Sequence, residues 1–132
     1  MHKDLYNNAK TVMAVNATTL AADGDTVGVI IDTEGFESGK VSLLATAVTT
    51  GDVTISNIQE SADSGMSGAT DIPVARIIGS ASAISAANVI DELGFVSTER
   101  YVQVTVTGAN TSVLTFVALC ELADPSSASV RG

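Results

Sequence analysis

Strict alternation of apolar and polar residues near the C-terminal end is the feature that most constrains the fold. Val102, Val104 and Val106 share one face of the run Tyr101–Thr107, while polar residues and one tyrosine share the other. Successive side chains of a strand point to opposite faces, so this run predicts a half-buried β-strand. Ser112–Leu122 is apolar on both faces. A strand of that kind is predicted to be central in a sandwich or to lie at a subunit contact.

Glycine-containing segments separate the alternating runs. Thr49–Asp52 contains Gly51 and stands between two such runs, so it is predicted to form a hairpin turn in which glycine supplies the positive φ angle. Gly108–Asn110 is predicted to turn between the two C-terminal strands in the same way. A long polar loop, Ser61–Pro73, is expected after the first pair, because glycine, serine and aspartate interrupt any strand there.

The overall composition favours strands over helices. Of the 132 residues, 45% are hydrophobic but only 4% are aromatic, and the apolar mass is valine, isoleucine, leucine and alanine. β-branched residues pack well on a pleated sheet, and no strand–helix–strand alternation is visible. We therefore predict an all-β, single-domain antiparallel β-sandwich or jelly roll. Residues 10–122 are expected to form it, with an N-terminal arm at 1–9 and a flexible C-terminal tail at 123–132.

The charge pattern excludes some partners and suggests others. Fifteen acidic residues against six scattered basic residues give a net charge of −9, which disfavours binding to nucleic acid. Charged residues make up only 16% of the chain, a low value for a free monomer, so contact with other subunits is expected. No signal peptide and no apolar stretch of bilayer length is visible. We expect the protein to be synthesised in the cytoplasm and not to associate with a membrane.

Residues with catalytic or metal-binding chemistry are scarce. The chain has one histidine, His2, and one cysteine, Cys120, so neither a zinc site within one chain nor a nucleophile–histidine pair is expected. The acidic segment 32–37 is interpreted as a solvated turn rather than a calcium loop. We predict no catalytic, cofactor or metal site and no enzymatic activity. Cys120 lies in an apolar run and is predicted to be buried, reduced and unreactive.

Three segments together carry a family resemblance. They are Asp4-Leu5-Tyr6-Asn7-Asn8, the stretch from Ile31-Asp32-Thr33 and Gly35-Phe36-Glu37-Ser38 to Ile58–Asp71, and Gly94-Phe95 with Glu99–Val104. In this order and spacing the chain resembles small virion proteins of tailed bacteriophages that are encoded among the head genes. Glu99 and Gln103 replace two basic residues that members of the family often carry in the third segment.

The resemblance implies a virion component without catalytic activity. The leading hypothesis is a capsid decoration (cement) protein on the outer head surface, which binds the major capsid protein and itself, as a homotrimer, by non-covalent contacts. One alternative is a head–tail connector or tail structural subunit. Another is a jelly-roll module that binds host glycans through the Ser61–Pro73 loop, although carbohydrate sites usually offer aromatic platforms that this chain scarcely has.

The predicted contact residues lie in three places. Loops and arms carry contacts because a rigid sheet holds them out and their sequence is free of core packing. The arm and the Ser61–Pro73 loop are therefore expected to reach neighbouring subunits, and the doubly apolar C-terminal strand is expected to add a face. The candidate interface residues are Leu5, Tyr6, Met66, Asp71, Leu114 and Phe116.

Overall fold

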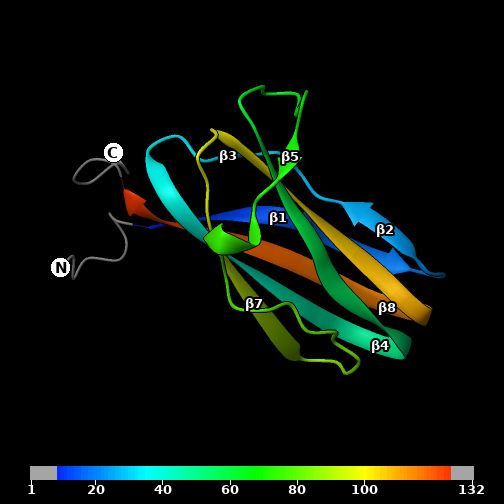
Figure 1. Cartoon of the computed structure of the whole chain (residues 1–132). Helices are drawn as coiled ribbons and strands as arrows, with labels where there is room; N and C mark the ends of the chain where they lie inside the picture. Colours follow the sequence, from blue (N-terminus) through cyan, green and yellow to red (C-terminus); the bar gives the residue numbers. More distant parts are fainter. Residues whose placement is uncertain (1–8, 126–132) are drawn as a thin grey trace.

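The structure is a computed structural model that describes residues 9–125. In this part of the chain eight strands and one short 3₁₀ helix follow one another (Figure 1). The strands are β1 (Lys10–Leu20), β2 (Gly24–Val27), β3 (Ile31–Asp32), β4 (Phe36–Ser61), β5 (Thr70–Asp71), β6 (Ile77–Ile78), β7 (Val89–Val96) and β8 (Tyr101–Pro125); the helix η1 is Val74–Arg76. No helix of this part is long and apolar enough to span a bilayer.

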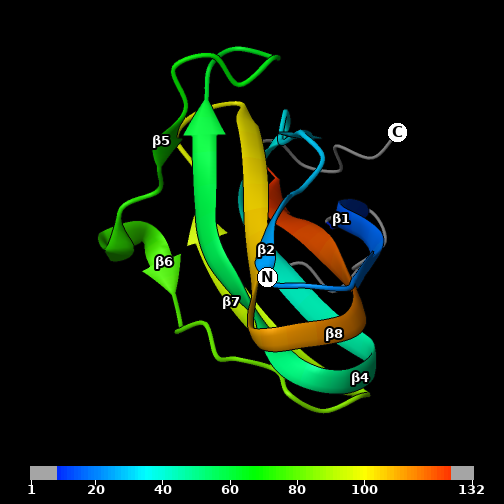
Figure 2. The same ribbon diagram turned by 90° about the vertical axis from the view of Figure 1, so that its right-hand side faces the viewer.

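Two very long strands organise the sandwich. β4 and β8 pair antiparallel along their whole length. Phe36 stands opposite Pro125 at one end and Ser61 opposite Tyr101 at the other, and both strands curl over midway (Figure 2). The first layer contains β1, the C-terminal half of β8, the N-terminal half of β4, β7 and β6. The second contains β2, β3, the N-terminal half of β8, the C-terminal half of β4 and β5. The predicted all-β sandwich is confirmed.

Both predicted hairpin turns are wrong. β4 runs through Thr49–Asp52 without a reversal, and β8 runs through Gly108–Asn110 in the same way, because each strand pairs with the other on both sides of the bend. Shifts in the register mark β-bulges at the bend, and bulges increase the local bending of a strand. The glycine signal itself is correct, since Gly51 has a φ angle of 78°. The sequence indicated a change in direction but not its kind.

The bend of β8 is held by a carboxylate from the loop between β1 and β2. Asn110 and Thr111 both have a φ angle of 60°. This conformation is unfavourable for Thr111, which is β-branched. The backbone N–H of Ser112 donates to Asp23 Oδ1 at 2.7 Å, and the N–H of Thr111 donates to Asp23 Oδ2 at 3.2 Å. These hydrogen bonds, that from Ser112 first, lower the pKa of Asp23. The β1–β2 loop thereby fixes the conformation of a distant strand.

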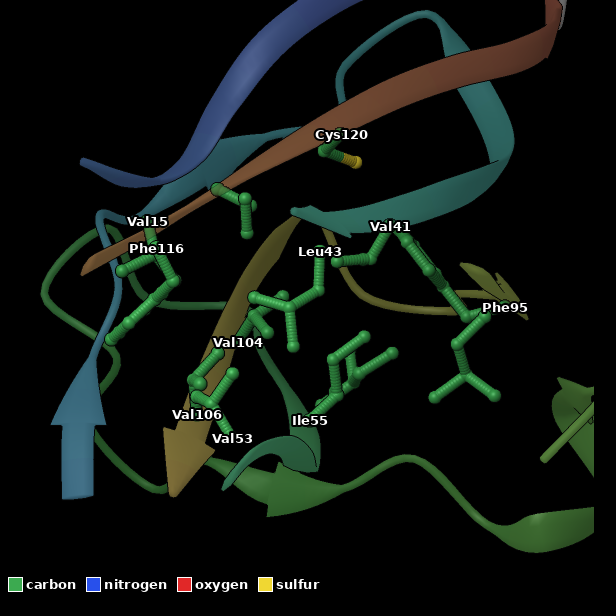
Figure 3. Packing of buried hydrophobic residues seen from close by; sticks show 14 of the residues in the cluster. Val15, Val41, Leu43, Val53, Ile55, Phe95, Val104, Val106, Phe116 and Cys120 are labelled. Atoms are coloured by element: carbon green, nitrogen blue, oxygen red, sulfur yellow. The ribbon is translucent and has the colours of Figure 1, made fainter. Parts of the chain in front are cut away.

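The core lies between the two layers and consists mainly of aliphatic side chains with two phenylalanines (Figure 3). Alternate residues of β8 point into it, from Val102 to Val106 in one layer and from Leu114 to Leu122 in the other. Leu114 is 3% exposed and Phe116 is 0% exposed. The prediction that these two side chains contact another subunit is therefore wrong, because the chain's own second layer covers them.

Cys120 is buried with 0% exposure, as predicted. Burial, and to a lesser extent the charge of Glu121, raise the pKa of its thiol to about 12. We expect the native protein to resist a thiol reagent at pH 8 and the urea-unfolded protein to react at once, measured by the rate of Ellman's reaction. Cys120→Ala is expected to cost about 1 kcal/mol of unfolding free energy. Rapid labelling under native conditions would contradict the burial.

The ends of the domain differ slightly from the predicted boundaries. β1 extends to Leu20, because its second half still pairs with β8 beyond the two register shifts. β8 extends to Pro125, so three residues of the predicted tail belong to a strand. The remaining tail and most of the predicted arm, residues 126–132 and 1–8, lie outside the described residues.

Candidate binding surfaces

The first layer exposes apolar side chains on its outer side. Met13 of β1 stands opposite Leu119 of β8, and Leu44 of β4 stands between Val117 of β8 and Ile90 of β7. Met13 is 38% exposed, Leu119 is 42% exposed and Ile90 is 59% exposed. These five residues, here called the outer apolar face, occupy neighbouring positions across four strands. Contiguous apolar surface of this kind is typical of an interaction site.

An ion pair lies beside the outer apolar face. Lys40 Nζ lies 2.9 Å from Glu92 Oε2, and Ser42 Oγ donates to the same carboxylate oxygen at 3.3 Å. The pair raises the pKa of Lys40 and lowers that of Glu92. All three side chains point outward from β4 and β7 because they alternate with core residues. A polar rim beside an apolar centre is the usual arrangement of a protein interface.

The loop between β4 and β5 is ordered by its own side chains. Asp63 Oδ2 accepts hydrogen bonds from the backbone N–H groups of Gly65 and Ser67, at 2.9 and 3.1 Å. Ser61 Oγ donates to the Ser67 carbonyl at 2.7 Å and accepts from the N–H of Asp63 at 3.0 Å. Met66 is half-buried and has a φ angle of 62°. The loop therefore presents a fixed shape rather than a loose one.

A buried ion pair anchors the base of this loop. Glu60 is 4% exposed, and Arg76 of η1 grips its carboxylate with two hydrogen bonds, of 3.1 and 2.6 Å. The backbone N–H of Thr98 donates to the same carboxylate at 3.0 Å. Arg76 also donates to the Val96 carbonyl at 3.0 Å. The pair thus ties the end of β4 to η1 and to the connection between β7 and β8.

The acidic segment 32–37 proves to be an ion-pair site rather than a purely solvated turn. Arg100 donates to both oxygens of Asp32, at 2.9 and 2.8 Å, and to Glu34 Oε2 at 2.8 Å. The hydrogen bonds that Arg100 donates to Asp32 lower the pKa of that carboxyl. The guanidinium of Arg100 also lies 5.1 Å from the ring centroid of Tyr101. The one tyrosine of the described part is therefore covered by a cation.

The structure brings some of the predicted contact residues to the surface but does not gather them at one site. Met66 and Asp71 lie in and after the β4–β5 loop, and Asp71 is exposed. Leu114 and Phe116 lie in the core, as described above, and Leu5 and Tyr6 lie outside the described residues. The sequence reasoning did not predict the outer apolar face. Its signal was present in the run Ser112–Leu122, whose second face, opposite Leu114 and Phe116, is also apolar.

No metal cluster is apparent: within residues 9–125, no three histidine, cysteine, aspartate or glutamate side chains lie close enough together to hold an ion.

Comparison of the sequence with protein-family models and with curated proteins finds no match. Among solved structures, the crystal structure of the PBSX exported protein XepA is similar over 100% of this chain, with a TM-score of 0.59 and 18% identity. This chain spans 42% of the length of that protein, which is less than half. A CBM4 structure is similar over 91% of this chain and 70% of its own, with a TM-score of 0.38 and 13% identity. The first likeness supports the sandwich fold, and the second is too weak to support an argument.

Proposed function

We propose that this chain is a structural protein of a phage particle, and specifically a decoration protein that binds the outer surface of the head shell. The observation that carries the proposal is the outer apolar face. The phage setting is supported by the family resemblance of the sequence, and it agrees with a sandwich fold like that of the PBSX exported protein XepA. The proposed role requires surface contacts alone and no catalysis.

The outer apolar face is suited to a permanent contact with the major capsid protein. Removing apolar surface from water contributes roughly 25 cal/mol per Å², so an apolar face of this kind gives most of its affinity through burial. The face belongs to a sheet whose other side packs on the core, so it is preorganised and loses little entropy on docking. The Lys40–Glu92 pair beside it supplies polar groups that fix the orientation of the partner.

The glycan-binding alternative receives less support from the geometry. Phe95 and Phe116 are fully buried, Phe36 is half-buried against the core, and Tyr101 lies beneath Arg100. The described residues thus offer no free aromatic ring on which a sugar could stack. A head–tail connector or tail subunit uses surfaces of the same kind, and the particle itself distinguishes that role from decoration.

Leu119→Asp tests the proposed role of the outer apolar face. The side chain is 42% exposed, so the variant is expected to fold, while a charge within the face, between Met13 and Ser42, opposes burial against the shell. We expect its occupancy on purified, undecorated capsids to fall at least about tenfold, which corresponds to roughly 1.4 kcal/mol. Co-sedimentation with the capsids measures this occupancy.

Val27→Asp is the matched control, because Val27 is 60% exposed but lies on β2 in the other layer. It is expected to keep wild-type occupancy, and circular dichroism should show that both variants fold. Equal occupancy of the two variants would remove the outer apolar face from the mechanism. No binding of the wild-type protein to any capsid would overturn the decoration role itself.

A further inference from the structure

A groove of about 560 Å³ runs beside the C-terminal half of β4. The segment that carries β5, η1 and β6 stands beside this half of the strand (Figure 2) and forms the other wall. The floor is apolar and includes Ile55, Ile58 and Leu93. Val74, which is 88% exposed, stands at the rim. The volume of the groove lies within the range of sites that bind ligands or peptide side chains.

The groove lies along a stretch of β4 that no described strand covers. Val53 exchanges two backbone hydrogen bonds with Ile84, and the Ile58 carbonyl accepts one from the N–H of Ile72. Between these points the described part of the chain pairs β4 only with β8, on its other side. Ile55 follows Val53 by two residues, so its backbone groups point to the same side, into the groove. This short stretch leaves the backbone groups of Ile55 available for pairing with the backbone of an occupant.

The rim of the groove is polar and negatively charged. Asp71 Oδ1 accepts hydrogen bonds from Asn57 Nδ2 at 3.3 Å and from Gln59 Nε2 at 3.1 Å. Among residues 9–125, no cation forms an ion pair with Asp71. Asn57 Oδ1 is buried and has no hydrogen-bond partner among the described residues. An occupant with a basic side chain and a further donor matches this rim.

The other long edge of the sheet is protected. β1 borders the first layer, but its register with β8 is shifted at two places, between Met13 and Val15 and between Val15 and Thr18. Bulges bend and twist an edge strand so that another strand does not pair with it easily. The edge of β4 also has a register shift, between Ile55 and Asn57, but it borders a groove with an apolar floor that can take side chains, so the argument for β4 rests on the groove.

We propose that this groove binds residues 1–8 of a second copy of the chain. This inference rests on the self-assembly included in the proposed function. In an added strand Lys3 and Leu5 share one face, and Asp4 and Tyr6 share the other. On the face turned to the groove, Leu5 suits the apolar floor and Lys3 suits Asp71, while Asp4 points away from that carboxylate.

The positions of the arm and the groove favour a neighbour over the same chain. Lys10, Leu122, Gly39, Phe95 and Ile77 stand in one row across five strands, with Lys10 and Ile77 at opposite edges. The arm therefore starts about 19 Å across the sheet from the groove, at about 4.8 Å per strand spacing. The five residues from Lys10 back to Leu5 span at most about 18 Å, so Leu5 of the same chain falls short of the groove. A contact between one end of a subunit and another face of the next is head-to-tail, and such contacts form a ring where the rotation between subunits closes. A homotrimer is the ring expected here.

Two full-length variants and their mixture test this arrangement by sedimentation velocity without capsids. Leu5→Asp damages the arm and leaves the groove intact, whereas Asp71→Lys reverses the charge of the groove and leaves the arm intact. The wild type is expected to sediment as a trimer and each variant as a monomer. Mixing the two monomers is expected to give a 1:1 dimer, because each supplies the part that the other lacks. Glu37→Lys, an exposed acid away from the groove, is the control and should remain trimeric.

A monomeric wild type, a trimeric Leu5→Asp or Asp71→Lys variant, or no association on mixing would each overturn the arm–groove contact. The mixture separates loss of a contact from loss of folding, since misfolded variants do not complement each other. Capsids are absent from this experiment, so its failure leaves attachment to the shell untouched. Conversely, a trimer that forms as expected but binds no capsid would count against decoration alone.

Discussion

Replacing Gly51 by alanine is expected to lower the free energy of unfolding by about 3 kcal/mol or more. A Cβ atom at this position lies 2.5 Å from Ser112 Cα and 2.6 Å from the Ala109 carbonyl oxygen. Both neighbours are backbone atoms of β8, so they cannot rotate away. The φ angle of 78° adds strain for any residue with a side chain. Urea-induced unfolding, followed by circular dichroism, measures the change.

Two other glycines separate these causes. Gly68 has a φ angle of 67° but nothing within 4 Å of a Cβ atom, so Gly68→Ala is expected to cost about 1 kcal/mol from backbone strain alone. Gly24 has neither strain nor a close neighbour, and its replacement by alanine should leave stability almost unchanged. A Gly51→Ala variant no less stable than Gly68→Ala would show that β4 and β8 do not approach this closely at the bend.

Glu60→Gln is expected to cost about 2 to 3 kcal/mol of unfolding free energy at pH 7, because it removes the charge from a buried acceptor of several hydrogen bonds. The amide of glutamine accepts at one oxygen only, so it cannot satisfy the two donors of Arg76 and the backbone N–H of Thr98. Glu34→Gln is the control. Glu34 also pairs with an arginine, but its side chain is 69% exposed, and exposed ion pairs contribute little.

The pH dependence of this difference follows from the pKa of Glu60. The hydrogen bonds from Arg76, and then that from Thr98, lower this pKa below its ordinary value of 4.5. A lowered carboxyl pKa gives stability that is fully present above 4.5 and is lost as the pH falls through the lowered value. The difference in unfolding free energy between wild type and Glu60→Gln, here called the gap, should therefore be constant from about pH 6 to 8 and shrink below about pH 4.5.

Unfolding curves at a series of pH values measure this gap. A gap that stays constant down to pH 3, or one that is no larger than the gap for Glu34→Gln, would contradict the buried ion pair.

The sequence predicted the local structure better than the topology. Alternation over Tyr101–Thr107 correctly indicated which valines are buried, because the period of a strand determines its faces. It did not show that β8 continues past Gly108, since a positive φ angle is compatible with a hairpin or with a bend. Pairing with β4 determines that the chain bends here and does not form a hairpin. Asp52 of β4 stands opposite Ala109 although the two are about sixty residues apart in the chain. Short-range patterns carry no information about that partner.

The candidate binding surfaces were predicted in part for the same reason. The run Ser112–Leu122 is apolar on both faces, so periodicity gave two equivalent sets of residues and no basis for choosing between them. The choice of Leu114 and Phe116 was wrong because the second layer, which comes from other segments, covers that face. The groove beside β4 has no sequence signature at all. It exists because β5, η1 and β6 leave a stretch of the strand edge unpaired.

A density map of particles assembled from the genome that encodes this chain shows directly whether the chain is a decoration protein. We expect the chain to occupy the outer surface of the head, with Met13, Leu44 and Leu119 covered by the major capsid protein. Density for the chain in the neck or tail, or an outer apolar face that remains exposed to solvent on the decorated shell, would contradict it.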